Sequence, residues 1–387
     1  MSADPLLLRG LGLPTAGLDG PTALLVADGR IAATDGDAES GAGDARTLDC
    51  TGLAAVPGFI ELQVNGIAGR DFTTDPAAMW EVGAVLARYG VTAFLPTIVT
   101  SPRGSVEAAL HAWSAGSNDA IGAVPLGLHV EGPYLAPGRT GAHPRDLLRA
   151  PDLDELRGWL GTDALRILTL APELPDATRA IEMVAGAGAV ASVGHTDADA
   201  PTAQRAVEAG ARYATHLFNA MPPLLHRAPG AAGALLADER VTVGLVVDGH
   251  HLAPLMVGLV ARLAPQRVSL VSDAIAGLGL PDGPHRLGDR TVTVGEGAAR
   301  LPDGTLAGSV VALDACVRGM ANASGSASLA VDAVTVTPAR LLGLADGRGG
   351  LVVGGRADVT LLDRELQVRA TIVAGNVVHA GDGLAWH

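Results

Sequence analysis

Short apolar segments followed by helical stretches recur eight times between residues 56 and 345 of this chain. Strands that alternate with amphipathic helices are typical of parallel βαβ units. Eight such units close into a barrel whose catalytic groups lie at the carboxyl ends of the strands. The pattern therefore predicts an α/β fold with a (β/α)8 TIM barrel. We expect its strands at residues 59–64, 91–96, 124–131, 166–172, 189–195, 211–217, 241–248 and 267–273.

The two ends of the chain have a different pattern from the middle. Residues 1–55 and 346–387 contain short apolar pieces separated by Asp-Gly and Gly-rich turns, which are typical of small antiparallel strands. We therefore expect both chain termini to form one small β-sandwich domain beside a barrel of residues 56–345.

One helix is expected directly after the first barrel strand. Asp75 can cap it, Pro76 fits its first turn, and Gly90 can end it. Four apolar residues between these points share one helical face, namely Met79, Val82, Leu86 and Tyr89.

Every one of the 27 positions counted as lysine or arginine is arginine, so the chain contains no lysine. Its chemistry therefore cannot use a Schiff-base lysine, a phosphate-loop lysine or a carbamylated lysine that bridges two metals.

The formal net charge of −14 disfavours nucleic acid and anionic membrane surfaces as partners. A small anionic substrate remains compatible if basic side chains gather locally. No charge-free apolar run approaches the roughly 18 residues that span a bilayer, and no basic region precedes the first apolar residues as in a signal peptide. We expect a cytoplasmic protein. Cys50 and Cys316 are too few for a disulfide framework.

Three predicted strand ends carry residue types that can hold a catalytic metal. Glu131 lies in LHVEGPY, His195 in SVGHT and His216 in THLFNAM. One carboxylate and two imidazoles leave a coordination position for water, as in catalytic zinc sites. Each residue alone is more simply a cap or a core histidine, but all three together at the barrel mouth would be costly to desolvate without a metal.

Asp273 ends the eighth predicted strand in LVSDA and would face the same mouth. A carboxylate there could take a proton from water and deliver it to a leaving group. The alternative role is a helix cap, but the Gly-rich residues that follow are poor helix formers. We therefore favour catalysis.

Basic and amide side chains follow the sixth and seventh predicted strands. FNAMPPLLHRAPG contains Asn219, His226 and Arg227, and VVDGHHLAP contains His250 and His251. An arginine can fork onto a phosphate, and amide groups can add donors. Surface placement is the simpler reading of each residue alone, but together on one rim of an acidic protein they predict an anion pocket.

Taken in order, these residues resemble those of the N-acetylglucosamine-6-phosphate deacetylases, a family of the amidohydrolase superfamily. The resemblance covers nearly the whole chain. LHVEGP with THLFNAM is a specific pair, whereas TPAR and GRAD occur widely across amidohydrolases. The matching motifs are PGFIELQVNG, LHVEGPY, GAH, VGHT, THLFNAM, HRAPG, DGHH, LVSDA, LAGS, TPARLLGL and GGRADVTLLD.

This resemblance implies a metal-dependent hydrolase barrel with a small β domain, assembled as a homodimer. It implies a divalent metal, commonly zinc or iron, held by Glu131, His195 and His216. Asp273 matches the general base and acid of the family.

The resemblance also implies the contacts to a phosphosugar substrate. His251 matches a residue near the reacting centre, and Asn219, Ala220 and Arg227 match phosphate and sugar contacts. In the family this arginine can come from the neighbouring subunit. His143, in GAH, matches a further substrate contact.

Gln63 and Asn65, in FIELQVNG, stand where the wider superfamily has two metal-binding histidines. Some deacetylases of the family share this replacement, which implies one metal per subunit. The absence of lysine agrees, because binuclear relatives generally bridge their metals with a carbamylated lysine.

The implied activity is hydrolysis of the acetamide of N-acetylglucosamine 6-phosphate to glucosamine 6-phosphate and acetate. The alternatives are the same reaction on N-acetylgalactosamine 6-phosphate or another N-acyl amino sugar and, more remotely, an inactive barrel that serves as a binding protein.

Overall fold

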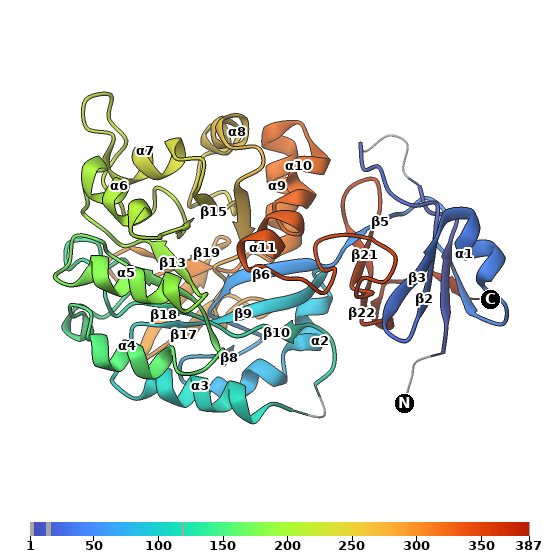
Figure 1. Ribbon diagram of the computed structural model, residues 1–387, viewed down its shortest axis with the longest axis horizontal. Coiled ribbons are helices and arrows are strands. Elements are labelled where there is room, and N and C mark those ends of the chain that lie inside the picture. The colour runs from blue at the N-terminus through green and yellow to red at the C-terminus, as the bar shows by residue number, and fades with distance from the viewer. Residues whose placement is uncertain (1–3, 13–16, 118–119, 387) are drawn as a thin grey trace.

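A computed structural model describes residues 4–12, 17–117 and 120–386 of the chain. A parallel β-barrel with surrounding helices lies beside a smaller β unit built from the first and the last described strands of the chain (Figure 1). Across the described ranges, no helix is both long enough and apolar enough to cross a membrane.

All eight predicted barrel strands are present. They run in parallel around the barrel in chain order, and the first and last strands meet through the Asp273 N–H, which donates to the carbonyl of Gln63 at 2.9 Å. The third predicted strand is interrupted at Gly127, where φ is +123° and a Cβ would lie 2.5 Å from the Ala164 carbonyl oxygen. The strands are β6 (Phe59–Val64), β9 (Val91–Val99), β10 with β11 (Val124–Pro125, Leu128–Glu131), β12 (Leu165–Leu170), β13 (Val190–Val193), β14 (Tyr213–Ala214), β15 (Thr242–Val246) and β16 (Val268–Val271).

Helices cover the outside of the barrel (Figure 1). Helix α5 shows why they form, because its apolar residues recur at helical spacing and are buried against the strands. The helices of this layer are α2 (Gly83–Ala87), α3 (Ser105–Ala115), α4 (Leu153–Trp159), α5 (Ala177–Gly186), α6 (Ala200–Glu208), α7 (Gly230–Ala237), α8 (Pro254–Leu263), α9 (Leu313–Ser324), α10 (Ala327–Asp332) and α11 (Val336–Leu341). Short elements in the loops are β7 (Gly66–Ile67), β8 (Arg70–Asp71), and the 3-10 helices η1 (Pro76–Trp80) and η2 (Arg145–Leu147).

The single helix predicted over residues 75–90 is wrong in its continuity. It divides into η1 and α2. The backbone of residues 121–123 packs against Gly83 at this point, and the Ala123 N–H donates to the Gly83 carbonyl. Asp75 does not cap the helix with its side chain, since that carboxylate pairs with Arg70 at 3.2 Å.

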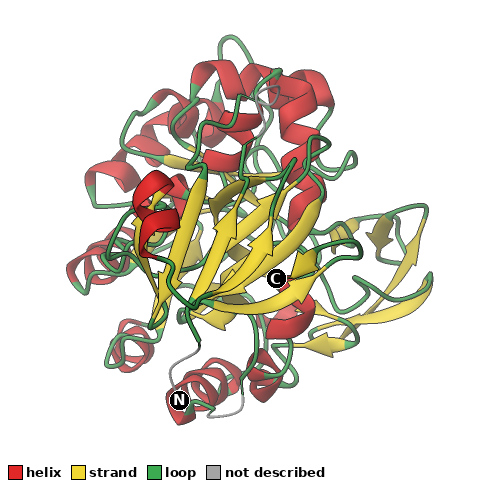
Figure 2. Cartoon of the chain, turned by 90° about the vertical axis from the view of Figure 1, so that its right-hand side faces the viewer, coloured by secondary structure: helices red, strands yellow, loops and turns green. Residues whose placement is uncertain are grey.

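Two small sheets from the chain ends pack face to face through a shared apolar cluster, as expected for a sandwich (Figure 2). One pairing differs from the antiparallel expectation, since β1 and β4 are parallel. The helix α1 (Asp35–Gly41) connects the third strand of the chain to β4. The first sheet contains β1 (Leu6–Arg9), β2 (Ala23–Ala27), β3 (Arg30–Thr34), β4 (Arg46–Asp49) and β24 (Ala385–Trp386). The second contains β5 (Ala54–Pro57), β21 (Val359–Leu362), β22 (Val368–Val373) and β23 (Asn376–Ala380).

A third antiparallel sheet, which the sequence patterns did not predict, interrupts the chain between β16 and α9. It comprises β17 (Gly283–Leu287), β18 (Arg290–Gly295), β19 (Ala298–Arg300) and β20 (Leu306–Ser309). Its apolar face packs on Val99 and Ile275, beside the carboxyl ends of β9 and β16. The sheet therefore forms one wall of the barrel mouth.

Candidate active site

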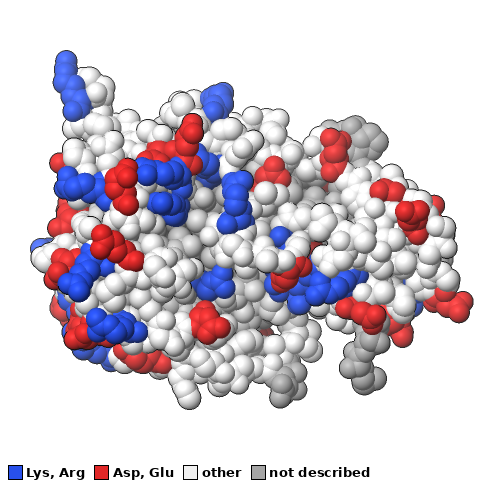
Figure 3. Space-filling model, viewed as in Figure 1, with Lys and Arg blue, Asp and Glu red and all other residues white. Residues whose placement is uncertain are grey.

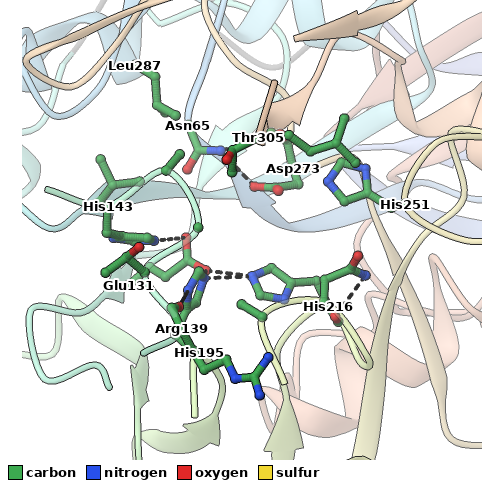
Figure 4. A pocket seen from close by; sticks show the side chains of 18 of the residues that line it. Asn65, Glu131, Arg139, His143, His195, His216, His251, Asp273, Leu287 and Thr305 are labelled. Carbon is green, nitrogen blue, oxygen red and sulfur yellow. Dashed lines mark hydrogen bonds and ion pairs between the residues drawn. The ribbon is translucent and has the colours of Figure 1, made fainter. Parts of the chain in front are cut away.

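The proposed metal and acid residues meet at the carboxyl end of the barrel (Figure 4). Glu131 ends β11, whereas His195, His216 and Asp273 each lie just beyond their strand. These last three residues have positive φ angles of 47°, 29° and 50°. Non-glycine residues rarely adopt this conformation, and it is concentrated at functional sites.

Glu131, His195 and His216 form a buried cluster whose ligand atoms all lie within 4.8 Å of one another. The Oε1 atom of Glu131 lies 3.3 Å from His195 Nε2 and 3.0 Å from His216 Nε2. The two Nε2 atoms are 3.1 Å apart. The structure therefore brings the three predicted ligands together.

The surroundings of His195 fix which of its nitrogens can bind a cation. Its Nδ1 lies 2.8 Å from the carbonyl oxygen of Arg139, which can only accept, so the neutral ring carries its proton on Nδ1. The lone pair of Nε2 then points at Glu131 Oε1 and His216 Nε2. A bound cation would satisfy all three donor atoms, and this orientation of a ligand by a backbone carbonyl is common at metal sites.

Gln63 bridges the two carboxylates of the site, and Asn65 contacts one of them. The Gln63 side-chain amide donates to Glu131 Oε1 and to Asp273 Oδ1, both at 3.2 Å. Asn65 donates to Asp273 Oδ1 at 2.8 Å. The side-chain N–H groups of Gln63 and Asn65 thus occupy positions beside the carboxylates of Glu131 and Asp273 where a second cation would have to bind.

Burial and proximity shift the ionisation of the acidic pair in opposite directions. Burial, followed by the charge of Glu131, raises the pKa of Asp273. Burial also acts to raise the pKa of Glu131, but the His195 and His216 side chains in contact with its carboxylate outweigh burial and hold that pKa well below its usual range.

Two further histidines are held in fixed orientations beside the cluster. His251 Nδ1 lies 2.7 Å from the buried carboxylate of Asp248, which leaves Nε2 available to the pocket. His143 Nδ1 lies 2.8 Å from Thr100 Oγ1, and its Nε2 lies 3.8 Å from Glu131 Oε2. Burial lowers the pKa of His143 to about 3, so its ring is neutral at physiological pH.

A cavity of about 390 Å³ opens onto the cluster. Of the predicted substrate contacts, His143, Asn219, Ala220 and His251 line it. Arg227 does not line this cavity and lies in an exposed loop. His226 and His250 are also exposed outside it. Of the basic residues predicted to gather at one rim, only His251 lines this cavity.

Several lining residues were not predicted from the sequence. Arg139 and its neighbours in residues 138–142 come from the loop after β11, Val99 comes from the end of β9, and the others come from the third sheet and its turns. The motif LAGS, residues 306–309, supplies two of them, but nothing in its sequence pattern indicated that it approaches the barrel mouth. The lining residues from the sheet region are Leu287, Asp303, Thr305, Leu306 and Gly308.

The chain matches known proteins along most of its length. Residues 54–378 match the model of the Amidohydrolase family. An N-acetylglucosamine-6-phosphate deacetylase from Bos taurus is 40% identical over 345 residues, which cover 85% of this chain and 84% of the relative. An N-acetylgalactosamine-6-phosphate deacetylase from Escherichia coli O157:H7 is 36% identical over 83% of this chain and 86% of its own length.

A solved structure extends the match to three dimensions. It is a mutant N-acetyl-D-glucosamine-6-phosphate deacetylase from Mycobacterium smegmatis in complex with N-acetyl-D-glucosamine-6-phosphate. This structure superposes with a TM-score of 0.85 at 34% identity and covers 97% of this chain and 99% of its own. The chain belongs to the amidohydrolase family and, within it, to the N-acetylglucosamine-6-phosphate deacetylases.

Proposed function

We propose that the protein hydrolyses the acetamide of N-acetylglucosamine 6-phosphate to glucosamine 6-phosphate and acetate. The observation that carries this proposal is the buried cluster of Glu131, His195 and His216 with Asp273 beside it, in a cavity large enough for a sugar phosphate. An inactive binding barrel would have no need for such an array of buried ionisable groups.

The three ligands would hold one divalent cation, for which zinc suits the two imidazoles and the carboxylate. When bound, the cation would supply Lewis-acid polarisation and lower the pKa of water. The amides of Gln63 and Asn65 favour a single cation, because their N–H groups point at the carboxylates that a second one would need.

Asp273 would accept the proton of the attacking water and then deliver it to the amine that leaves the sugar. Its raised pKa favours the first step, since a carboxylate that binds its proton more tightly is a better base. His251, oriented by Asp248, would donate from Nε2 to the developing oxyanion when it is protonated. His143, Asn219 and Ala220 would position the sugar.

The assay that tests this proposal measures acetate release from N-acetylglucosamine 6-phosphate and its galactosamine epimer side by side. We expect a higher kcat/KM with the glucosamine compound. A preference for the epimer would instead support deacetylation of N-acetylgalactosamine 6-phosphate, the activity for which the Escherichia coli relative is named. Binding of the sugar without acetate release from either epimer, with metal supplied, would favour the inactive binding protein.

Arg227 would serve the site of a second copy of this chain. It lies in the exposed loop 223–229, which projects beyond α7 (Figure 1). An apolar stripe on α8 runs beside this loop, since Leu255, Leu259 and Leu263 are 77%, 42% and 57% exposed and Leu263 borders the same groove as Leu224. A symmetric dimer could cover this stripe and carry Arg227 across to the partner.

Mixed dimers can show whether Arg227 acts across subunits. Subunits with Arg227→Met and subunits with Asp273→Asn, mixed in equal amounts and allowed to exchange, should recover about a quarter of wild-type activity, because half of the dimers then contain one complete site. Each variant incubated alone is the control. A monomeric protein, or no recovery on mixing, would contradict the arrangement.

A further inference from the structure

Arg139 links a metal ligand to the rim of the cavity. Its backbone carbonyl accepts the Nδ1 proton of His195, and its side chain lines the same cavity on the His195 side (Figure 4). The side chain is 33% exposed, whereas Glu131 and His195 are almost fully buried. The guanidinium therefore lies nearer the cavity mouth than the reacting groups do.

The guanidinium is oriented by one contact and otherwise uncommitted. Its Nε donates to Asp197 Oδ1 at 2.5 Å. Within the described residues, Nη1 and Nη2 donate to no protein acceptor. Gly138 permits this arrangement, because a Cβ there would lie 2.3 Å from Asp197 Oδ2. The pair of Nη groups is thus held ready for an acceptor in the cavity.

Arg139 is also the one arginine that lines this cavity among the residues the structure describes. It lies beside the proposed sugar contacts, since Asp197 follows Thr196, whose N–H donates to the Ala220 carbonyl at 3.1 Å. A substrate whose acetamide reaches the buried cluster must extend its far end toward this rim. In the proposed substrate that end is a phosphate, and a guanidinium fork matches phosphate oxygens.

We propose that Arg139 binds the phosphate of the substrate from within the same subunit and so sets the preference for phosphorylated over unphosphorylated amino sugars. This inference rests on the proposed function. It gives each subunit its own phosphate contact, in addition to Arg227 of a second copy.

The test compares kcat/KM for N-acetylglucosamine 6-phosphate and for N-acetylglucosamine in Arg139→Met. Loss of a charged hydrogen bond should lower the ratio of the two values about ten- to a hundredfold. Bound metal should stay at the wild-type level, because His195 is held by the backbone carbonyl and not by the side chain. Arg145→Met is the matched control, since Arg145 is exposed in the same loop, carries the same charge and does not line the cavity.

An unchanged ratio in Arg139→Met, or an equal loss with both sugars, would overturn the proposal. Calorimetric binding of glucosamine 6-phosphate and of glucosamine separates it from the proposed function. A wild type that releases no acetate from either sugar contradicts the deacetylase activity alone. The binding ratio should still fall by the same factor in Arg139→Met, and a ratio that does not fall would overturn the role of Arg139.

Discussion

Replacing Asp273 with asparagine is expected to lower kcat by about a hundred- to ten-thousandfold, the usual contribution of a positioned general base. Asparagine has nearly the same shape and can still accept from Asn65 and Gln63, whose donors lie 2.8 and 3.2 Å from Asp273 Oδ1. It cannot take a proton. The site should therefore keep its architecture and lose its chemistry.

Acetate release and bound metal, measured on the same preparation of Asp273→Asn, check this result. Metal should remain at the wild-type level, because Asp273 lies outside the Glu131, His195 and His216 cluster. Asp303→Asn is a suitable control, since this carboxylate also lines the cavity but is exposed. Turnover near the wild-type rate, with metal bound, would remove Asp273 from the mechanism.

Removing the metal is expected to have an effect at least as large. Lewis-acid stabilisation is worth several kcal/mol, which corresponds to roughly a thousandfold or more in rate. Dialysis of the wild type against a chelator should therefore abolish acetate release, and added zinc should restore it. His216→Ala should be inactive and should not recover at the same zinc concentration, because one of three ligands is gone.

His285→Ala is the control for His216→Ala, because it removes a histidine that is not a predicted metal ligand. This side chain is half-buried on β17, its Nε2 lies 2.9 Å from the carbonyl oxygen of Pro281, and it does not line the cavity. His285→Ala should bind metal and turn over as the wild type does. Activity that survives complete metal removal in the wild type would contradict the proposed chemistry.

The barrel strands could be predicted because each is an apolar segment whose signal lies within a few residues. The polar residue at each strand end follows from the same pattern, so Glu131, His195, His216 and Asp273 could be placed at one mouth before their distances were known. Strand order needed only the rule that successive βαβ units are neighbours.

Features that depend on contacts distant in sequence could not be predicted in this way. The helix expected over 75–90 breaks because residues 121–123 reach Gly83. The third sheet has ordinary hairpin patterns, and only its packing on Val99 and Ile275 places it at the active site. The sequence likewise does not distinguish Arg139 from the other arginines, because its place in the site depends on the contact between its loop and His195.

Surface charge also depends on tertiary structure. On the face shown in Figure 3, basic and acidic side chains alternate over much of the barrel. Arg240, for example, pairs with both Asp238 and Glu208. Such pairs limit the positive field that any single arginine presents.

Titration of the metal-depleted wild type with zinc, with bound metal and acetate release followed together, tests the central claim most directly. We expect activity to rise in proportion to bound zinc and to reach its maximum at one ion per chain, held by Glu131, His195 and His216. Full activity without bound metal, or a requirement for two ions per chain, would contradict a site built around a single cation.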